Sequence, residues 1–319
     1  MESTSLRVHQ FLGLRPGPRL LVTAAVHGNE TCGSVAIPRV VDALDQNMLR
    51  LVRGTVTFVP VANPKAYARR TREGDRNLNR DLRPTVVVTE FEDRVANQLC
   101  PLLAAHDVLL DLHSFNNPGQ AFVMVGPRDN DGDVEPFAHE QAESRLALSL
   151  GVSRIVEGWL GTYVAGARRR QTGGRSDLRS VTQYGVGTTE FMRSQGGYGV
   201  TLECGQHDDP LAVEVATTAI LNALAQLGMI DKPAPRPDPS RVEVLRMYDV
   251  VDRDDANDAF MRPWASFDPI GQDTLIARRK DGTPLRAPHD GRIIFPNDAA
   301  RPGEEWFYLT RYSDRQLPT

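Results

Sequence analysis

Short, almost uninterrupted apolar runs alternate with longer amphipathic stretches up to about residue 230 of the chain. The apolar runs at 19–25 (RLLVTAA), 55–62 (TVTFVPVA) and 108–112 (VLLDL) have the length and composition of buried strands. Amphipathic spacing at 90–105 and 211–227 predicts helices between and after them. A strand that is apolar on both faces needs cover on both faces, so the pattern predicts an α/β layer structure with a largely buried sheet.

A change of composition separates this part from the rest of the chain. Residues 232–240 (KPAPRPDPS) contain four prolines, which is typical of a stiff linker. Beyond them the helical patterns stop, and short extended runs are separated by DG, PG and ND turn signals. We therefore expect a large domain over residues 1–232 and a small all-β domain over residues 241–319.

Charge and cysteine content limit the partners and the compartment. A net charge of -4 and a pI of about 6.0 argue against nucleic acid or an anionic membrane as a partner. Six arginines crowded into residues 69–83 instead favour a small anion. Three cysteines without a CxxC pair predict neither a disulfide framework nor a cysteine-rich zinc module. With no secretory signal or membrane-spanning run, we expect a cytoplasmic protein.

Two histidines and a glutamate are candidate metal ligands. His27 and Glu30 stand three residues apart directly after the strand at 19–25, with Gly28 between them to permit an unusual turn. His113 ends the strand at 108–112, and strand ends on one edge of an α/β sheet are where ligands converge. Asp111, on the same face of that strand, could orient a metal-bound imidazole. A lone HxxE pair is common by chance, however, and no HExxH helix is present.

Four motifs in order carry a family resemblance: HGNE at 27–30, TREGDRNLNR at 71–80, DLH at 111–113 and TLECG at 201–205. Over residues 15–230 the chain resembles the succinylglutamate desuccinylase and aspartoacylase family, a branch of the zinc carboxypeptidase superfamily. The resemblance implies a zinc carboxypeptidase-like catalytic domain with a mixed central sheet flanked by helices. One motif departs from the pattern, because Asn77 stands where an aspartate is common.

The resemblance also implies a role for each matching residue. The zinc ligands, one ion per chain, correspond to His27, Glu30 and His113. Asn79 and Arg80 match the pair that holds a substrate carboxylate. Arg72 matches the arginine that polarises the scissile carbonyl, and Glu203 matches the general base that activates water on the metal. Without the resemblance, Glu203 is equally well read as a structural ion pair, and an arginine-rich loop is usually solvated.

Together these expectations describe a zinc-dependent amidohydrolase acting on a small N-acyl amino acid or a related carboxylate-bearing substrate. Arg80 suits a carboxylate because its planar guanidinium offers two parallel donors. The alternatives are a metallocarboxypeptidase, a small-molecule esterase with the same machinery, and a binding module that has lost catalysis.

Several features have no assigned role. The basic, glycine-rich stretch at 166–179 is expected to be an exposed loop, with a lid over the metal as the alternative. Candidate hydroxyls for catalysis come from three tyrosines, Tyr163, Tyr184 and Tyr198. His207 stands out only because it closely follows the TLECG motif. Residues 283–296 resemble the hairpin of a barrel-sandwich domain but lack its carrier lysine motif. We therefore expect this domain to shape the cleft or to mediate self-association, so a homo-oligomer is possible.

Overall fold

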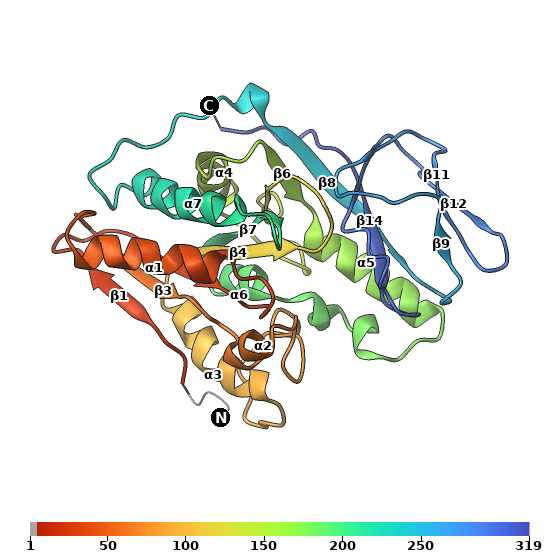
Figure 1. Cartoon of the computed structure of the whole chain (residues 1–319), viewed down its shortest axis with the longest axis horizontal. Coiled ribbons are helices and arrows are strands. Elements are labelled where there is room, and N and C mark those ends of the chain that lie inside the picture. Colours follow the sequence, from red (N-terminus) through yellow and green to blue (C-terminus); the bar gives the residue numbers. More distant parts are fainter. Residues whose placement is uncertain (1–4, 319) are drawn as a thin grey trace.

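A computed structural model describes residues 5–318 and is built around a large mixed sheet (Figure 1). Its eleven strands run in the order β1-β3-β2-β4-β7-β5-β6-β8-β14-β13-β10. Neighbours in the middle, such as β2 with β4 and β4 with β7, are parallel, whereas β5 runs antiparallel to β7. The strands are β1 His9–Leu12, β2 Arg19–Ala24, β3 Thr55–Val59, β4 Val108–Phe115, β5 Phe122–Met124, β6 Arg154–Glu157, β7 Tyr198–Gln206, β8 Glu243–Asp252, β10 Pro269–Ile270, β13 Gly291–Ile294 and β14 Glu305–Tyr312.

Helices cover both faces of the sheet, as predicted from its apolar strands. The α-helices are α1 Cys32–Asp45, α2 Pro64–Arg69, α3 Phe91–Ala104, α4 Glu140–Ser149, α5 Trp159–Thr172, α6 Thr188–Ser194 and α7 Ala212–Gln226. One core joins α1, α4 and α7 to one face, and a second joins α3 and α6 to the other. The expected α/β class with a mixed central sheet flanked by helices is therefore confirmed.

Side-chain alternation along the central strands decides which residues reach the site. In β4, Leu110 and Leu112 belong to the core under α1 and α7, whereas Leu109 belongs to the core under α3 and α6. Asp111 and His113 follow Leu109 at two-residue steps and share its face. Polar side chains therefore collect on the α6 face, at the carboxyl ends of β4 and its neighbours.

The C-terminal strands continue the same sheet. β8 pairs in parallel with β6, and β14 pairs antiparallel with β8 (Figure 1). A separate three-stranded sheet is formed by β9 Ala259–Phe260, β11 Leu275–Arg278 and β12 Pro284–Arg286. Short 3-10 helices lie at η1 Leu178–Ser180, η2 Thr182–Gly185 and η3 Pro239–Arg241, the last within the proline-rich segment. The domain boundary expected between residues 232 and 241 stays a prediction.

The basic stretch at 166–179 differs from its expected form. Helix α5 runs through its first half to Thr172, and Gly166, Ala167 and Arg170 are buried in that helix. Arg170 is held by an ion pair with Asp252 in β8 at 2.6 Å, so this half of the stretch is not an exposed loop. Among residues 5–318, no helix is both long and apolar enough to cross a membrane.

Candidate functional site

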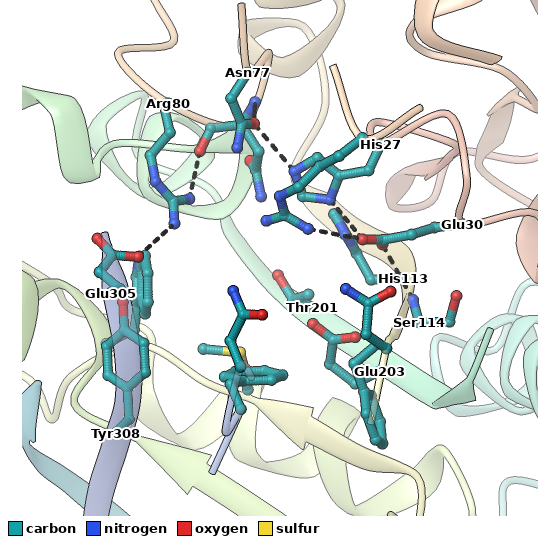
Figure 2. A pocket seen from close by; sticks show the side chains of 18 of the residues that line it. His27, Glu30, Asn77, Arg80, His113, Ser114, Thr201, Glu203, Glu305 and Tyr308 are labelled. Atoms are coloured by element: carbon teal, nitrogen blue, oxygen red, sulfur yellow. Dashed lines mark hydrogen bonds and ion pairs between the residues drawn. The ribbon is translucent and has the colours of Figure 1, made fainter. Parts of the chain in front are cut away.

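The candidate site lies where β2, β4 and β7 end, in a cavity of about 380 Å³ (Figure 2). His27 follows β2, His113 lies in β4 and Glu203 lies in β7 directly opposite His113 in the strand register. Parallel strands bring their carboxyl ends to one edge, so residues far apart in sequence meet here. All the residues predicted for the site line this cavity: His27, Glu30, Arg72, Asn79, Arg80, His113 and Glu203.

The three candidate metal ligands are buried and converge. One ligand atom from each of His27, Glu30 and His113 lies within 4.8 Å of the others. Glu30 is central, because its Oε1 lies 2.8 Å from His27 Nδ1 and its Oε2 lies 2.8 Å from His113 Nδ1. The structure thus brings together the set that the sequence predicted as a metal site.

The hydrogen bonds of Asn77 define the protonation of His27. The Oδ1 of Asn77 accepts from the backbone N–H of Asn79 at 2.9 Å, which identifies this atom as the oxygen. The same Oδ1 lies 3.0 Å from His27 Nε2, so Nε2 must carry the proton of the neutral ring. Asn77 therefore acts as a hydrogen-bond acceptor for His27 Nε2, in a position where the family that the sequence resembles commonly has an aspartate.

The other ring nitrogen of His27, Nδ1, faces the carboxylate of Glu30. Burial and the nearby Arg72 lower the pKa of His27 to about 4, so the ring is neutral at pH 7. With its proton on Nε2, the ring turns the Nδ1 lone pair toward the carboxylate oxygen of Glu30 at 2.8 Å. Arg72 donates to Glu30 Oε1 at 3.1 Å, but among the described residues no hydrogen-bond donor to His27 Nδ1 is found. The two acceptors that face each other suit a metal ion between them, and zinc takes such a set of nitrogen and carboxylate ligands.

His113 is oriented from its far side by Asp111. Its Nε2 donates to Asp111 Oδ2 at 2.8 Å, and the hydroxyls of Thr23 and Thr188 donate to the same carboxylate. Burial lowers the pKa of His113, but the carboxylates of Asp111 and Glu30 outweigh burial and raise that pKa well above its usual value. A metal ion at Nδ1 would take the place of that second proton. The predicted orienting role of Asp111 agrees with this geometry.

Gly28 is needed here for a different reason from the one expected. Its backbone is not in the left-handed region, whereas that of Ala25 has φ of 47°. A Cβ on Gly28 would instead lie 2.0 Å from the backbone carbon of Ala66 in α2. The turn between His27 and Glu30 therefore packs directly on the backbone of α2, and only glycine fits.

Glu203 lies beside the metal ligands and has an unused oxygen. Its side chain is buried, and its Oε2 has no hydrogen-bond partner among the described residues. Burial, and next the charge of Glu30, raise the pKa of Glu203 to about 8. A buried carboxyl without a partner is costly unless a ligand or water completes it, which fits a group that works on a substrate.

Two arginines reach the cavity in different ways. Arg72 is 48% exposed and donates to Glu30 Oε1 at 3.1 Å, beside the candidate ligands. Arg80 is 11% exposed, stacks at 4.8 Å on the ring of Trp159 and lies 3.7 Å from Glu305. Figure 2 shows Arg80 and Glu305 across the cavity from His27, Glu30 and His113. Asn79 joins this wall through its Oδ1, which accepts from the backbone N–H of Thr188.

Sequence reasoning missed the contribution of the C-terminal strands. Glu305 and Tyr308, both on β14, line the cavity opposite the metal ligands (Figure 2). They belong to no short motif and lie far along the chain from the other residues, so the extended runs expected in residues 241–319 gave no sign that this strand reaches the site. Among the three candidate tyrosines, Tyr184 lines the cavity, whereas Tyr163 and Tyr198 do not.

A family comparison agrees with the motifs. Residues 16–127 match the family model described as the succinylglutamate desuccinylase/aspartoacylase catalytic domain. The matched segment contains three of the four motifs, and the family resemblance predicted from them is confirmed. A comparison with curated protein sequences finds no match. The family match supports a hydrolytic enzyme of the deacylase type.

Solved structures share the fold over nearly the whole chain. A succinylglutamate desuccinylase/aspartoacylase from Rhodobacter sphaeroides has a TM-score of 0.71 at 17% identity, covering 97% of this chain and 90% of that chain. A succinylglutamate desuccinylase from Vibrio cholerae has a TM-score of 0.71 at 16% identity, covering 98% of this chain and 88% of that chain. The product-bound ectoine utilization protein EutE (DoeB) from Ruegeria pomeroyi has a TM-score of 0.69 at 18% identity, covering 95% of this chain and 88% of that chain. At these identities the likeness shows a common fold, and it includes the C-terminal strands.

Proposed function

We propose that this chain, whose residues 16–127 match a desuccinylase/aspartoacylase catalytic domain, is a zinc-dependent amidohydrolase. Its substrate is a small N-acyl amino acid or a related amide that bears a carboxylate. The observation that carries the proposal is the contact of His27 Nδ1 with Glu30 Oε1 at 2.8 Å. With the His27 proton held at Nε2 by Asn77, Nδ1 is left as a free acceptor beside the carboxylate, which suits a metal ion bound by both.

The residues present fit zinc. His27, Glu30 and His113 would hold one ion, and the far nitrogens of both rings already donate to oxygens, as zinc-bound histidines do. When bound, zinc supplies a Lewis acid that makes water a stronger nucleophile and polarises a carbonyl.

The chain's own residues supply the proton transfer and the charge stabilisation. Glu203 has a free buried oxygen, and the positive charge of the bound ion would lower its raised pKa and so favour the carboxylate. As a carboxylate it accepts the proton of the attacking water and returns it to the leaving nitrogen. Arg72 lies next to Glu30 and donates hydrogen bonds to the carbonyl oxygen as negative charge develops on it. Both groups stand on the metal side of the cavity.

The opposite wall sets the substrate. Arg80, supported by Trp159 and Glu305, presents a positively charged donor surface for a carboxylate, and Asn79 stands beside it. A cavity of about 380 Å³ walled by β14 suits a small molecule rather than a long peptide. This supports a deacylase over a metallocarboxypeptidase.

The experiment is a hydrolysis panel of N-acyl amino acids, their amides without the carboxylate, matched esters and a long peptide. We expect turnover of small carboxylate-bearing amides. In Arg80→Ala, KM for those substrates rises by about tenfold or more, since an ionic hydrogen bond contributes roughly 1.5–3 kcal/mol. The matched control is Arg83→Ala, an exposed arginine of the same loop that pairs with Asp81, and it should behave like the wild type. Unchanged KM in Arg80→Ala, or preference for long peptides, would overturn the assignment.

A further inference from the structure

His207 is a cavity residue that the proposed reaction does not use. It follows β7, four positions after Glu203, and its ring is partly buried in the cavity wall. Its Nδ1 lies 2.8 Å from the hydroxyl of Ser114, and its Nε2 lies 3.3 Å from the amide nitrogen of Asn29. Both ring nitrogens are therefore taken up by neighbouring side chains, which is the arrangement of a bridge rather than of a free acid or base.

His207, Asn29 and Ser114 come from three separate segments of the chain. Asn29 lies in the turn between His27 and Glu30, and Ser114 directly follows His113 in β4. The backbone N–H of Ser114 also donates to Glu30 Oε2 at 3.1 Å (Figure 2). One imidazole thus connects the segments that carry all three candidate metal ligands with the segment that carries Glu203.

The sheet is irregular at the same place. The register of β4 and β7 holds from Val108 to His113 and then shifts before Phe115. Within this shift Gly205 adopts a left-handed conformation with φ of 128°. Past it, the backbone N–H of His207 donates to the carbonyl of Phe115 at 3.0 Å. Because the regular ladder is interrupted beside the ligands, side-chain hydrogen bonds add to the few backbone ones that hold the strand ends there.

We propose that His207, through Ser114 and Asn29, is a positioning residue that holds the ligand-bearing segments in the geometry that binds the metal. The inference rests on the proposed metal site. In this role His207 contacts neither the metal nor the substrate, because both of its ring nitrogens already have hydrogen-bond partners. Hydrogen bonds behind metal ligands commonly set metal affinity, and their loss costs about 10- to 100-fold.

The test is zinc affinity, measured by competition with a chromophoric chelator. We expect His207→Ala to bind zinc about 10- to 100-fold more weakly than the wild type. His207→Gln should recover part of the loss, because its amide offers both a donor and an acceptor. The matched control is His139→Ala, since His139 is exposed and its Nε2 lies 3.1 Å from the backbone carbonyl of Gly196 rather than beside a metal-ligand segment. Its affinity should equal that of the wild type.

A second measurement separates positioning from general damage. Ser114→Ala and the Ser114→Ala/His207→Ala double variant should lose similar affinity, because both break the same bridge. Urea unfolding of the metal-free proteins identifies any variant that fails to fold, in which case Asn29→Ala replaces it. Zinc binding by His207→Ala within twofold of the wild type, or full additivity in the double variant, would overturn the inference while leaving the proposed function intact. Absence of zinc binding by the wild type would overturn both.

Discussion

Replacing Asn77 by alanine removes one acceptor from two buried donors. Asn77 Oδ1 accepts from the ring of His27 at 3.0 Å and from the backbone N–H of Asn79 at 2.9 Å, and Asn77 is only 8% exposed. Alanine offers neither donor a partner. In the free protein the neutral ring of His27 can then place its proton on Nδ1, toward Glu30, which is the nitrogen that the metal needs.

The loss of stability comes from the backbone N–H of Asn79, because the proton of His27 can turn to Glu30 instead. A buried donor without an acceptor costs about 1–3 kcal/mol. We therefore expect Asn77→Ala to lower the free energy of unfolding by about 1–3 kcal/mol. Zinc affinity should fall by about 10- to 100-fold, because the ring is no longer held in the metal-binding tautomer. Asn77→Asp keeps an acceptor and should retain zinc affinity close to that of the wild type.

The assay combines urea unfolding of the metal-free protein with zinc competition. The matched control is Asn97→Ala, which loses two hydrogen bonds to Thr85 at 2.7 and 2.8 Å and whose side chain does not line the cavity. It should lose stability but keep its zinc affinity. If Asn77→Ala binds zinc as tightly as the wild type, the assignment of the His27 tautomer is wrong.

Three further predictions concern single residues. Glu203→Gln should lower kcat by about 100-fold or more while elemental analysis finds its metal content unchanged; comparable activity would exclude Glu203 as the base. Gly28→Ala should weaken zinc binding and destabilise the fold by about 1–3 kcal/mol, because the added Cβ meets the backbone of Ala66 at 2.0 Å; unchanged affinity and stability would contradict this packing. Burial raises the pKa of Asp258, but hydrogen bonds from Arg279 and three backbone N–H groups lower it from 3.8 to about 2. Because the folded state favours the carboxylate, its contribution of about 2 kcal/mol is present above pH 4 and is lost as the pH falls toward 2. Asp258→Asn should therefore be less stable at pH 7 but not at pH 2, as measured by urea unfolding, and an equal deficit at both would refute it.

The sequence predicted the fold where burial is simple and failed where it is mixed. The apolar runs at 19–25 and 108–112 are β2 and β4, because a strand covered on both faces has an unmistakable composition. Helix α5 was missed, since glycines and three arginines obscure its buried positions. The partner that buries one of those arginines, Asp252, comes from a strand much later in the chain. Such long-range ion pairs leave no local pattern.

The site divides in the same way. His27 and Glu30 share a turn and His113 ends a buried strand, so short motifs and strand topology sufficed to group them. Glu305 forms the facing wall only because β14 pairs with β8, which in turn pairs with β6. Neither pairing has a signal in the sequence beyond apolar strands, so the substrate wall required the structure.

The most direct test of a metal-dependent mechanism is elemental analysis of the purified protein beside a His27→Ala/His113→Ala double variant. We expect about one zinc per chain in the wild type, held by the three convergent ligands, and none in the double variant. A wild-type protein that binds no metal after incubation with zinc, yet still hydrolyses N-acyl amino acids, would contradict this expectation.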